Sequence, residues 1–191
     1  RIGLESTVVR LIDERVEILR PGGITLEQLL ADGFSAHYFD PGSDPVPVAN
    51  ASPDTLPSPG MLDRHYAPSV PLLFFEREYA GPNNSADLRE LIQQYKLPTG
   101  KIGSLYFESL DKAQSIAGIN DLSKTIQSLS EYSLELSSKG DLIEAAARLF
   151  RLFDTAAEAG LACLLVCAVP DEGLGRAIND RLRRAATFVL R

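Results

Sequence analysis

The sequence predicts an α/β fold made of a small N-terminal piece, a proline-rich linker and a three-layered domain with helices on both faces of a parallel or mixed sheet. Two observations predict it. After residue 70, short apolar segments alternate with amphipathic segments of helical period, and six prolines between residues 40 and 60 favour an extended linker. Hydrophobic residues make up 45% of the 191 positions and charged residues 24%, the usual balance of a folded protein. We expect the chain to divide into residues 1–39, 40–69 and 70–191.

The N-terminal piece is predicted to start with a β-hairpin. Residues 6–11 and 16–19 are rich in β-branched and aliphatic side chains, and the polar residues 13–15 between them are typical of a tight turn. A two-stranded ribbon is only marginally stable in water, so we expect residues upstream of this chain to complete the sheet. The first residue is Arg1 rather than methionine, which also leads us to expect a fragment of a longer protein.

A short helix is predicted to follow the hairpin. Thr25 is placed to cap its N-terminus, and Gln28, three residues later, completes the pattern of a capping box. Asp32-Gly33 is expected to end the helix, since glycine is favoured just after a helix C-terminus. The helix is therefore about two turns long, and with the hairpin it forms the whole of the first piece.

The domain after the linker is predicted to alternate strands with helices, which favours a sheet covered on both faces. We expect strands at residues 72–75, 101–107, 132–136 and 161–166, a helix capped by Ser85 and running to about residue 95, one or two helices within 110–130, and helices over 141–158 and 176–186. The helix over 141–158 has the clearest apolar stripe.

Charge and cysteine usage narrow the classes of function and compartment. The net charge of -7 opposes a broad nucleic-acid surface, so any anion site has to be local. Cys163 and Cys167 lie in one apolar run and are predicted to be buried thiols, because their spacing within a strand is too long for a disulfide. We find no metal-ligand pattern and no apolar run near the roughly 20 residues that span a bilayer. A reducing, cytoplasmic location and no membrane association are expected.

Two polar segments of the first piece are candidates for ligand binding. Ser6 and Thr7 are adjacent hydroxyls at a strand start, where they either face a cleft or pair with the backbone. Arg20 ends the second strand and precedes the turn Pro21-Gly22-Gly23. Its planar guanidinium can bind phosphate oxygens bidentately, the alternative being an ordinary surface arginine.

The end of the linker carries the least ordinary segment. Pro59, Gly60 and Met61 precede His65-Tyr66, and a titratable imidazole beside an aromatic ring suits a lid that folds over a site. The alternative is an anchoring aromatic residue with a bystander histidine. Farther on, Gly173 and Gly175 lie between a predicted strand and helix and form a candidate anion site, although the third glycine of a dinucleotide fingerprint is missing.

Taken in order, these segments resemble one family, the two-domain L-threonylcarbamoyladenylate synthases, in which a YrdC-like domain is joined to a Rossmann-like domain. The resemblance covers essentially the whole chain. The motifs that carry it are Glu5-Ser6-Thr7-Val8-Val9, Leu19-Arg20-Pro21-Gly22-Gly23-Ile24-Thr25, Pro59-Gly60-Met61 with His65-Tyr66-Ala67-Pro68, and Gly173-Leu174-Gly175 with Ala177-Ile178 and Arg181-Leu182. It implies that residues 1–39 end a YrdC-like domain and that residues 70–191 form the Rossmann-like accessory domain.

The resemblance also implies an activity. Enzymes of this family convert L-threonine, bicarbonate or CO2, and ATP with Mg2+ into threonylcarbamoyl-AMP and pyrophosphate, for the threonylcarbamoyladenosine modification of tRNA. By this resemblance Ser6 contacts L-threonine, Arg20 and Tyr66 contact ATP, and His65 with Pro59-Gly60-Met61 belongs to a linker lid. tRNA or tRNA-modification proteins are the partners it implies.

Part of the family's ATP site is missing from the chain. The Lys-x-Arg and Ser-x-Asn elements of the family's catalytic domain do not occur in a usable context, so no catalytic residue is assigned and the chain is expected to be inactive alone. The alternative is a non-catalytic, Rossmann-like module from about Val70 onward that binds a nucleotide or regulates a partner. The sequence upstream of Arg1 would be the most useful observation for choosing between a synthase and such a module.

Overall fold

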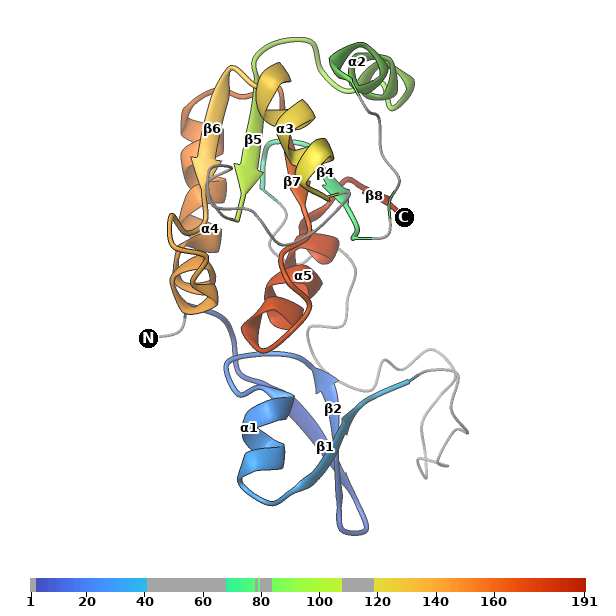
Figure 1. Ribbon diagram of the computed structural model, residues 1–191, viewed down its shortest axis with the longest axis vertical. Coiled ribbons are helices and arrows are strands. Elements are labelled where there is room, and N and C mark those ends of the chain that lie inside the picture. Colours follow the sequence, from blue (N-terminus) through green and yellow to red (C-terminus); the bar gives the residue numbers. More distant parts are fainter. Residues whose placement is uncertain (1–2, 41–67, 78, 80–83, 108–118) are drawn as a thin grey trace.

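The computed structural model describes residues 3–40, 68–77, 79, 84–107 and 119–191, and contains two β-sheets of different size. The smaller sheet is built from residues 8–38 and the larger one from residues 72–190. Figure 1 shows the smaller sheet below the larger one, with helix α5 between them.

The smaller sheet has three strands in the order β1-β2-β3. Its elements are β1 (Val8–Ile12), β2 (Arg15–Arg20), α1 (Leu26–Ala31) and β3 (Ser35–Tyr38). The predicted hairpin is confirmed, since β1 and β2 are antiparallel, although β1 begins two residues later than expected. The capping box of Thr25 and Gln28 is also confirmed.

Strand β3 was not predicted from the sequence. It pairs with β2 in parallel, and α1 makes the connection between them. Ser35 and His37 are exposed, and Ala36 and Tyr38 are only partly buried, so the segment lacks the β-branched and apolar character that marks a strand. Its pairing with β2, rather than its own composition, makes it a strand.

The larger sheet has five strands in the order β6-β5-β7-β4-β8, and all neighbouring pairs are parallel. The strands are β4 (Leu72–Phe75), β5 (Ile102–Tyr106), β6 (Tyr132–Glu135), β7 (Cys163–Cys167) and β8 (Phe188–Leu190). The expectation of a parallel or mixed sheet therefore resolves to a parallel one. Strand β8 was not predicted, because three residues are too few to show a period.

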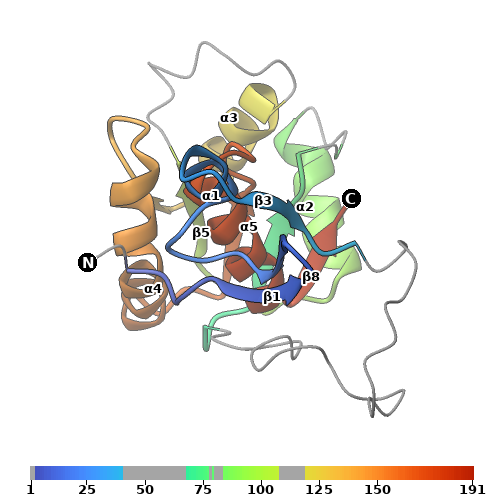
Figure 2. The same cartoon turned by 90° about the horizontal axis from the view of Figure 1, so that it is seen from below.

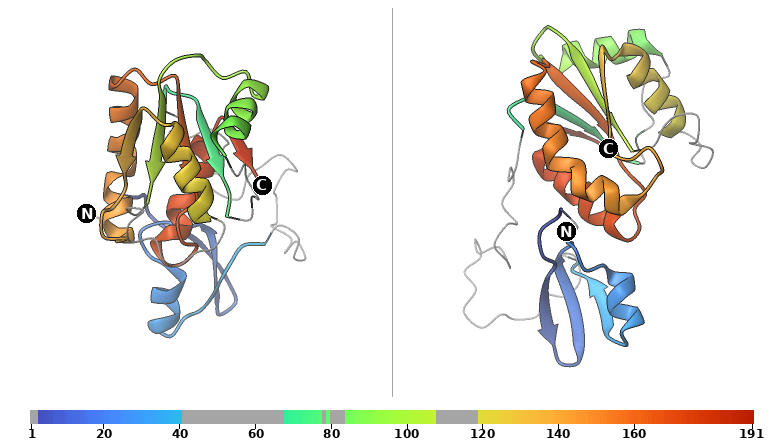
Figure 3. Two further views of the ribbon diagram at one scale, coloured as in Figure 1. Left: turned by 45° about the horizontal axis from the view of Figure 1, so that its top comes forward. Right: turned by 90° about the vertical axis from the view of Figure 1, so that its left-hand side faces the viewer.

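Four helices of the described residues cover the two faces of this sheet (Figure 3). They are α2 (Ser85–Gln94), α3 (Ile119–Leu129), α4 (Leu142–Glu158) and α5 (Leu174–Ala185). Along β4 the side chains alternate between faces: Leu72 and Phe74 pack in the core with α4 and α5, and Leu73 and Phe75 in the core with α2 and α3. The α/β/α architecture predicted for this part is confirmed.

Some helix boundaries differ from those predicted. Asn84, not Ser85, caps α2, because the Asn84 side chain accepts hydrogen bonds from the first-turn amides. Helix α5 begins at Leu174, two residues earlier than expected. Residues 108–118, where a further helix was considered, lie outside the described residues.

The carboxyl ends of the parallel strands point toward the smaller sheet (Figure 1), and the view along this direction shows β1 and α1 lying over α5 (Figure 2). Ligands of open parallel α/β sheets commonly bind outside this edge. In the part of the chain that the structure describes, no helix is long and apolar enough to cross a membrane.

Candidate functional site

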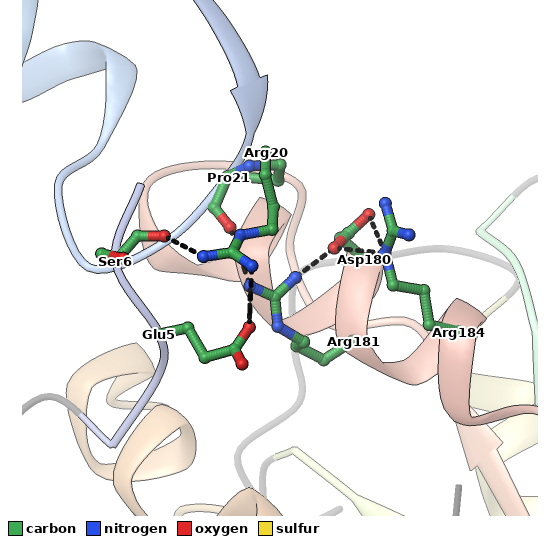
Figure 4. A network of polar contacts seen from close by, with 7 residues as sticks. All are labelled: Glu5, Ser6, Arg20, Pro21, Asp180, Arg181 and Arg184. Carbon is green, nitrogen blue, oxygen red and sulfur yellow. Dashed lines mark hydrogen bonds and ion pairs between the residues drawn. The ribbon is translucent and has the colours of Figure 1, made fainter. Parts of the chain in front are cut away.

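The candidate site lies where residues 5–7, residues 20–24 and helix α5 meet (Figure 4). The first two segments flank the β1–β2 hairpin, so hairpin pairing brings them side by side. The third comes from the other end of the chain. The site is therefore assembled from residues that are far apart in the sequence, as the ion pair between Glu5 and Arg181 shows.

The turn after β2 lies directly on residues 5–7. The amide of Gly23 donates to the Glu5 carbonyl at 2.9 Å, and the Thr7 hydroxyl accepts from the Ile24 amide at 2.9 Å and donates to the Ile24 carbonyl at 2.5 Å. A Cβ at Gly22 would stand 2.4 Å from the Thr7 nitrogen and 2.5 Å from the Glu5 carbonyl oxygen. Only glycine permits this approach.

Arg20 is enclosed by the first segment. It is 9% exposed, its Nη2 donates to the Ser6 carbonyl at 3.0 Å, and its Nη1 lies 3.5 Å from Oε2 of Glu5. The alternative of an ordinary surface arginine is therefore wrong. The structure places Arg20, predicted to contact ATP, against the backbone of Ser6, predicted to contact threonine.

Ser6 and Thr7 have different environments. The Thr7 hydroxyl bonds to the backbone of Ile24, which is the backbone-pairing alternative for this pair of hydroxyls. The residue Ser6 is exposed, and its carbonyl is fixed by Arg20. Of the two adjacent hydroxyls, that of Ser6 is thus the one on the surface of the site.

Helix α5 contributes a second buried arginine. The side chain of Arg181 is 1% exposed, and its Nη2 lies 3.0 Å from the same Glu5 oxygen that faces Arg20. The same nitrogen donates to the Pro21 carbonyl at 3.3 Å, and Nη1 pairs with Asp180. Asp180 in turn pairs with Arg184 at 3.0 Å.

The network has a positive excess. Three guanidinium groups, those of Arg20, Arg181 and Arg184, share the two carboxylates of Glu5 and Asp180, so these five side chains sum to one positive charge. Arginine retains its charge at any working pH. An anion that approached Ser6 would therefore meet an attractive local field in a chain whose net charge is -7.

A second set of contacts joins α5 to the smaller sheet at the helix N-terminus. The Gly173 amide donates to Oε1 of Glu27 at 3.4 Å, and the Arg176 guanidinium lies 4.9 Å from the centroid of the Tyr38 ring. Burial raises the pKa of Glu27, but hydrogen bonds from its own amide, Thr25 and Gly173, with the charge of Arg176, outweigh it and the pKa is lowered. The ionised carboxylate is thus favoured here.

The predicted anion site at Gly173 and Gly175 already holds a group of the chain itself. The carboxylate of Glu27 lies at the Gly173 amide, where a phosphate would lie in a nucleotide-binding turn. Gly175 packs on the preceding loop so closely that a Cβ would be 1.8 Å from the Pro170 carbonyl oxygen. The second glycine therefore serves the packing of α5 against its own loop.

The linker residues predicted to form a lid, Pro59, Gly60, Met61, His65 and Tyr66, lie outside the described residues. Among the residues that are described, no group of three or more His, Cys, Asp or Glu side chains could hold a metal ion.

The two cysteines are free thiols, as predicted. Cys163 is buried and Cys167 is partly buried, both in β7 of the larger sheet. Burial raises the pKa of both thiols to about 11, so they are protonated at neutral pH and take no part in the site.

Sequence reasoning missed the roles of Glu5 and Arg181. From the sequence, Arg181 is named only as part of a motif, whereas the structure shows it buried in an ion-pair network. A signal for this was present: Arg181 occurs at helical spacing among the buried residues of α5, Ala177, Ile178 and Leu182. An arginine on an apolar stripe has to find partners in the interior.

The fold and the site define an α/β protein in which a parallel-sheet domain is joined by ion pairs of a buried arginine to a smaller sheet that carries Ser6 and Arg20. Residues 24–187 match the family model described as threonylcarbamoyl-AMP synthase, C-terminal domain. The chain belongs to this family, which confirms the resemblance seen in its motifs.

Individual relatives match over almost the whole chain. The chain is 31% identical over 191 residues to the threonylcarbamoyl-AMP synthase of Pyrococcus abyssi, covering 98% of this chain and 47% of the relative. It is 31% identical over 185 residues to the Bacillus subtilis threonylcarbamoyl-AMP synthase, covering 97% of this chain and 46% of that protein. The chain thus spans about half the length of the curated relatives it matches.

The fold is also similar to a solved structure. The crystal structure of P. abyssi Sua5 complexed with L-threonine superposes with a TM-score of 0.60 at 29% sequence identity, covering 100% of this chain and 48% of that one. This match includes both sheets of the present chain, and it agrees with the α/β class predicted from the sequence.

Proposed function

We propose that this chain is the C-terminal part of an L-threonylcarbamoyladenylate synthase, which forms threonylcarbamoyl-AMP and pyrophosphate from L-threonine, bicarbonate or CO2, and ATP. Membership of the family and relatives with this name that match along the whole chain support the proposal. The similar P. abyssi structure, which was solved in complex with L-threonine, supports threonine as a ligand.

One observation carries the proposal. Arg20, matched to an ATP-contacting position of the family, donates to the backbone of Ser6, matched to a threonine-contacting position, at 3.0 Å. The reaction joins these two substrates, so the residues that bind them have to be neighbours. The positive excess of the surrounding ion pairs suits two anionic groups, the threonine carboxylate and the ATP phosphates.

The proposed reaction is an adenylyl transfer. The amino group of threonine adds to CO2 and loses a proton, and an oxygen of the resulting carbamate attacks the α-phosphorus of ATP. The bond to the β-phosphate oxygen breaks, and pyrophosphate leaves with that electron pair. ATP enters as its Mg2+ complex, and the ion neutralises phosphate charge. Such chemistry depends chiefly on positioning and charge stabilisation.

The roles of this chain's residues follow from their surroundings. The exposed Ser6 would orient threonine by a hydrogen bond. Arg20, held by Glu5 and by the Ser6 carbonyl, would present its guanidinium to phosphate oxygens. From the family resemblance we propose that Tyr66 contacts the nucleotide, and that His65 and Pro59-Gly60-Met61 form the linker that closes over it.

The division into domains and the cellular setting are part of the proposal. Residues 1–39 would end the catalytic YrdC-like domain, residues 40–69 would be the linker, and residues 70–191 the accessory domain. A cytoplasmic location is proposed because the product serves tRNA modification and because both cysteines are free thiols. tRNA or tRNA-modification proteins would then receive the product.

The assay that tests the proposal compares two proteins: this chain alone, and this chain preceded by its natural upstream sequence. Each is incubated with ATP, Mg2+, L-threonine and bicarbonate, and threonylcarbamoyl-AMP is detected by mass spectrometry. We expect product from the longer protein only, because the remaining ATP-binding elements of the family would lie upstream. Absence of product from the longer protein, or rapid formation by the chain alone, would contradict the proposal.

A further inference from the structure

Helix α5 carries a motif that the proposed substrate contacts do not use. We propose that Arg181 of α5 is a positioning residue. Through it, the larger α/β domain holds the two chain segments that carry Ser6 and Arg20, residues 5–7 and residues 20–24. The identity of the ligands at these segments rests on the proposed function. The mechanical connection itself rests on contacts within this chain.

The first support is that the larger domain holds three successive residues just before Ser6. Gly3 lies so close to α4 that a Cβ on it would be 2.4 Å from the Cα atom of Ala147. Leu4 packs against the core that α4 and α5 share, and Glu5 pairs with Arg181 at 3.0 Å. Ser6 therefore follows a segment that is fixed to the larger domain.

The second support is that Arg181 contacts both the segment before β1 and the turn after β2. Its Nη2 pairs with Glu5, immediately before Ser6, and donates to the carbonyl of Pro21, immediately after Arg20. One guanidinium thus spans the two chain segments that carry the predicted substrate contacts (Figure 4). Of the α5 side chains labelled in Figure 4, Arg181 is the one that bonds to both segments.

The third support is the burial of the charge. The Arg181 side chain is 1% exposed, and a buried guanidinium is costly unless it is paired. Its position is consequently tied to that of Glu5, and Glu5 is in turn shared with Arg20 at 3.5 Å. If the Arg181 guanidinium is removed, Glu5 loses one of its two arginine partners, and the Pro21 carbonyl loses the hydrogen bond from Arg181.

Arg183 provides a control on the same helix, outside the ion-pair network that surrounds Arg20. Its Nε lies 2.6 Å from Oε1 of Glu76, which follows β4 of the larger sheet, and its side chain is 42% exposed. Arg183→Gln therefore removes an equal charge and an ion pair that lies within the larger domain.

The first arm of the test needs no ligand. Amide hydrogen exchange is measured on the 191-residue chain for the Gly23 and Ile24 amides, which bond to Glu5 and Thr7. With Arg181→Gln we expect exchange at these amides to become about tenfold faster, while the Leu164 amide of the larger sheet is unchanged. With Arg183→Gln all three should exchange as in the wild type.

Two results of this arm would overturn the proposal: exchange unchanged by Arg181→Gln, or acceleration that is equal in both sheets. If Arg181→Gln does not fold, Glu5→Gln interrupts the same contact from the other side, and the same local acceleration is required of it.

The second arm measures steady-state kinetics of the longer protein that contains this chain. Arg181→Gln should raise the KM for threonine and for ATP about tenfold, Arg181→Lys should restore part of the loss, and Arg183→Gln should leave both values unchanged. Faster amide exchange with unchanged KM values would show that Arg181 only stabilises the fold, and would overturn the positioning role. If the wild type is inactive but Arg181→Gln still accelerates amide exchange, the proposed function is rejected. The contact of Arg181 with residues 5–7 and the turn after β2 is then still supported.

Discussion

The guanidinium group of Arg20 is held in one orientation by the chain itself. It donates to the Ser6 carbonyl, it faces the Glu5 carboxylate, and 11% of its side chain is exposed. A donor that is already oriented loses little conformational freedom when an anion binds. Arg20 should therefore contribute more to phosphate binding than an exposed arginine with the same charge.

Replacing Arg20 in the longer protein tests this directly. Arg20→Gln should raise the KM for ATP about 10- to 100-fold, since a hydrogen bond to a charged group contributes roughly 1.5–3 kcal/mol. Arg20→Lys should restore little, because lysine lacks the planar fork. Steady-state pyrophosphate release measures both.

The matched control is Arg10→Gln, because Arg10 lies in β1 of the same sheet and pairs with Glu17 rather than with the candidate site. It should leave the KM for ATP unchanged. Equal KM values for the Arg20 and Arg10 variants would contradict the role of Arg20.

At the residue scale, the sequence predicted the candidate contacts better than their support. Ser6 and Arg20 could be found because hydroxyls at a strand start and an arginine before a glycine turn are local patterns. Glu5 and Arg181 could not be paired in advance, since they are 176 positions apart (181 minus 5) and meet only in the folded chain.

Two elements hold the site together, the turn after β2 and the helix α5. The turn depends on Gly22, where a Cβ would be 2.4–2.5 Å from backbone atoms of Glu5, Ser6 and Thr7. Backbone atoms cannot yield as a flexible side chain can. A larger residue in place of Gly22 would therefore force the turn and residues 5–7 apart.

We predict that Gly22→Ala destabilises the smaller sheet by about 1–3 kcal/mol, the usual cost of overpacking, and raises the KM for both substrates. Urea unfolding and steady-state kinetics measure the two effects. Gly33→Ala is the comparison, because its Cβ would meet nothing within 4 Å and only its φ of +89° opposes the change. If both variants had the same effect on KM, the close approach at Gly22 would not matter for the site.

The contact between Glu27 and the start of α5 should depend on pH. The pKa of Glu27 is lowered in the folded chain from a reference of 4.5, so its contribution to stability is present above about pH 4.5 and is lost as pH falls through the folded value. Because Glu27 is exposed, the effect on the unfolding temperature should be small, about 1–2 °C.

Thermal unfolding of the wild type and of Glu27→Gln between pH 3 and pH 7 measures this contribution. The wild type should unfold at the higher temperature near neutral pH, and the two curves should converge at acid pH. A difference that stays constant over the whole range would show that the charge of Glu27 is not responsible.

At the element scale, β-branched composition located the hairpin, capping residues located helix α1, and alternating apolar and amphipathic segments located most of the larger domain. These patterns missed β3 and β8, because Ser35–Tyr38 has a polar, half-exposed pattern and Phe188–Leu190 is only three residues long. Both are strands because a neighbouring strand pairs with them. Such tertiary pairing leaves no trace in local composition.

For the molecule as a whole, the α/β class and the three-layered larger domain could be predicted, because alternating buried strands and amphipathic helices allow few other arrangements. The placement of the smaller sheet against α4 and α5 could not. It depends on the close approach of Gly3 to Ala147 and on the burial of Arg181, neither of which has a local signature.

The central claim is that this chain supplies Ser6 and Arg20 to a shared site for L-threonine and ATP. A crystal structure of the longer protein with L-threonine and a non-hydrolysable ATP analogue tests it most directly. The account predicts threonine within about 3.5 Å of the Ser6 hydroxyl and a phosphate oxygen within about 3.5 Å of the Arg20 guanidinium. Both ligands bound entirely by residues outside this chain would contradict it.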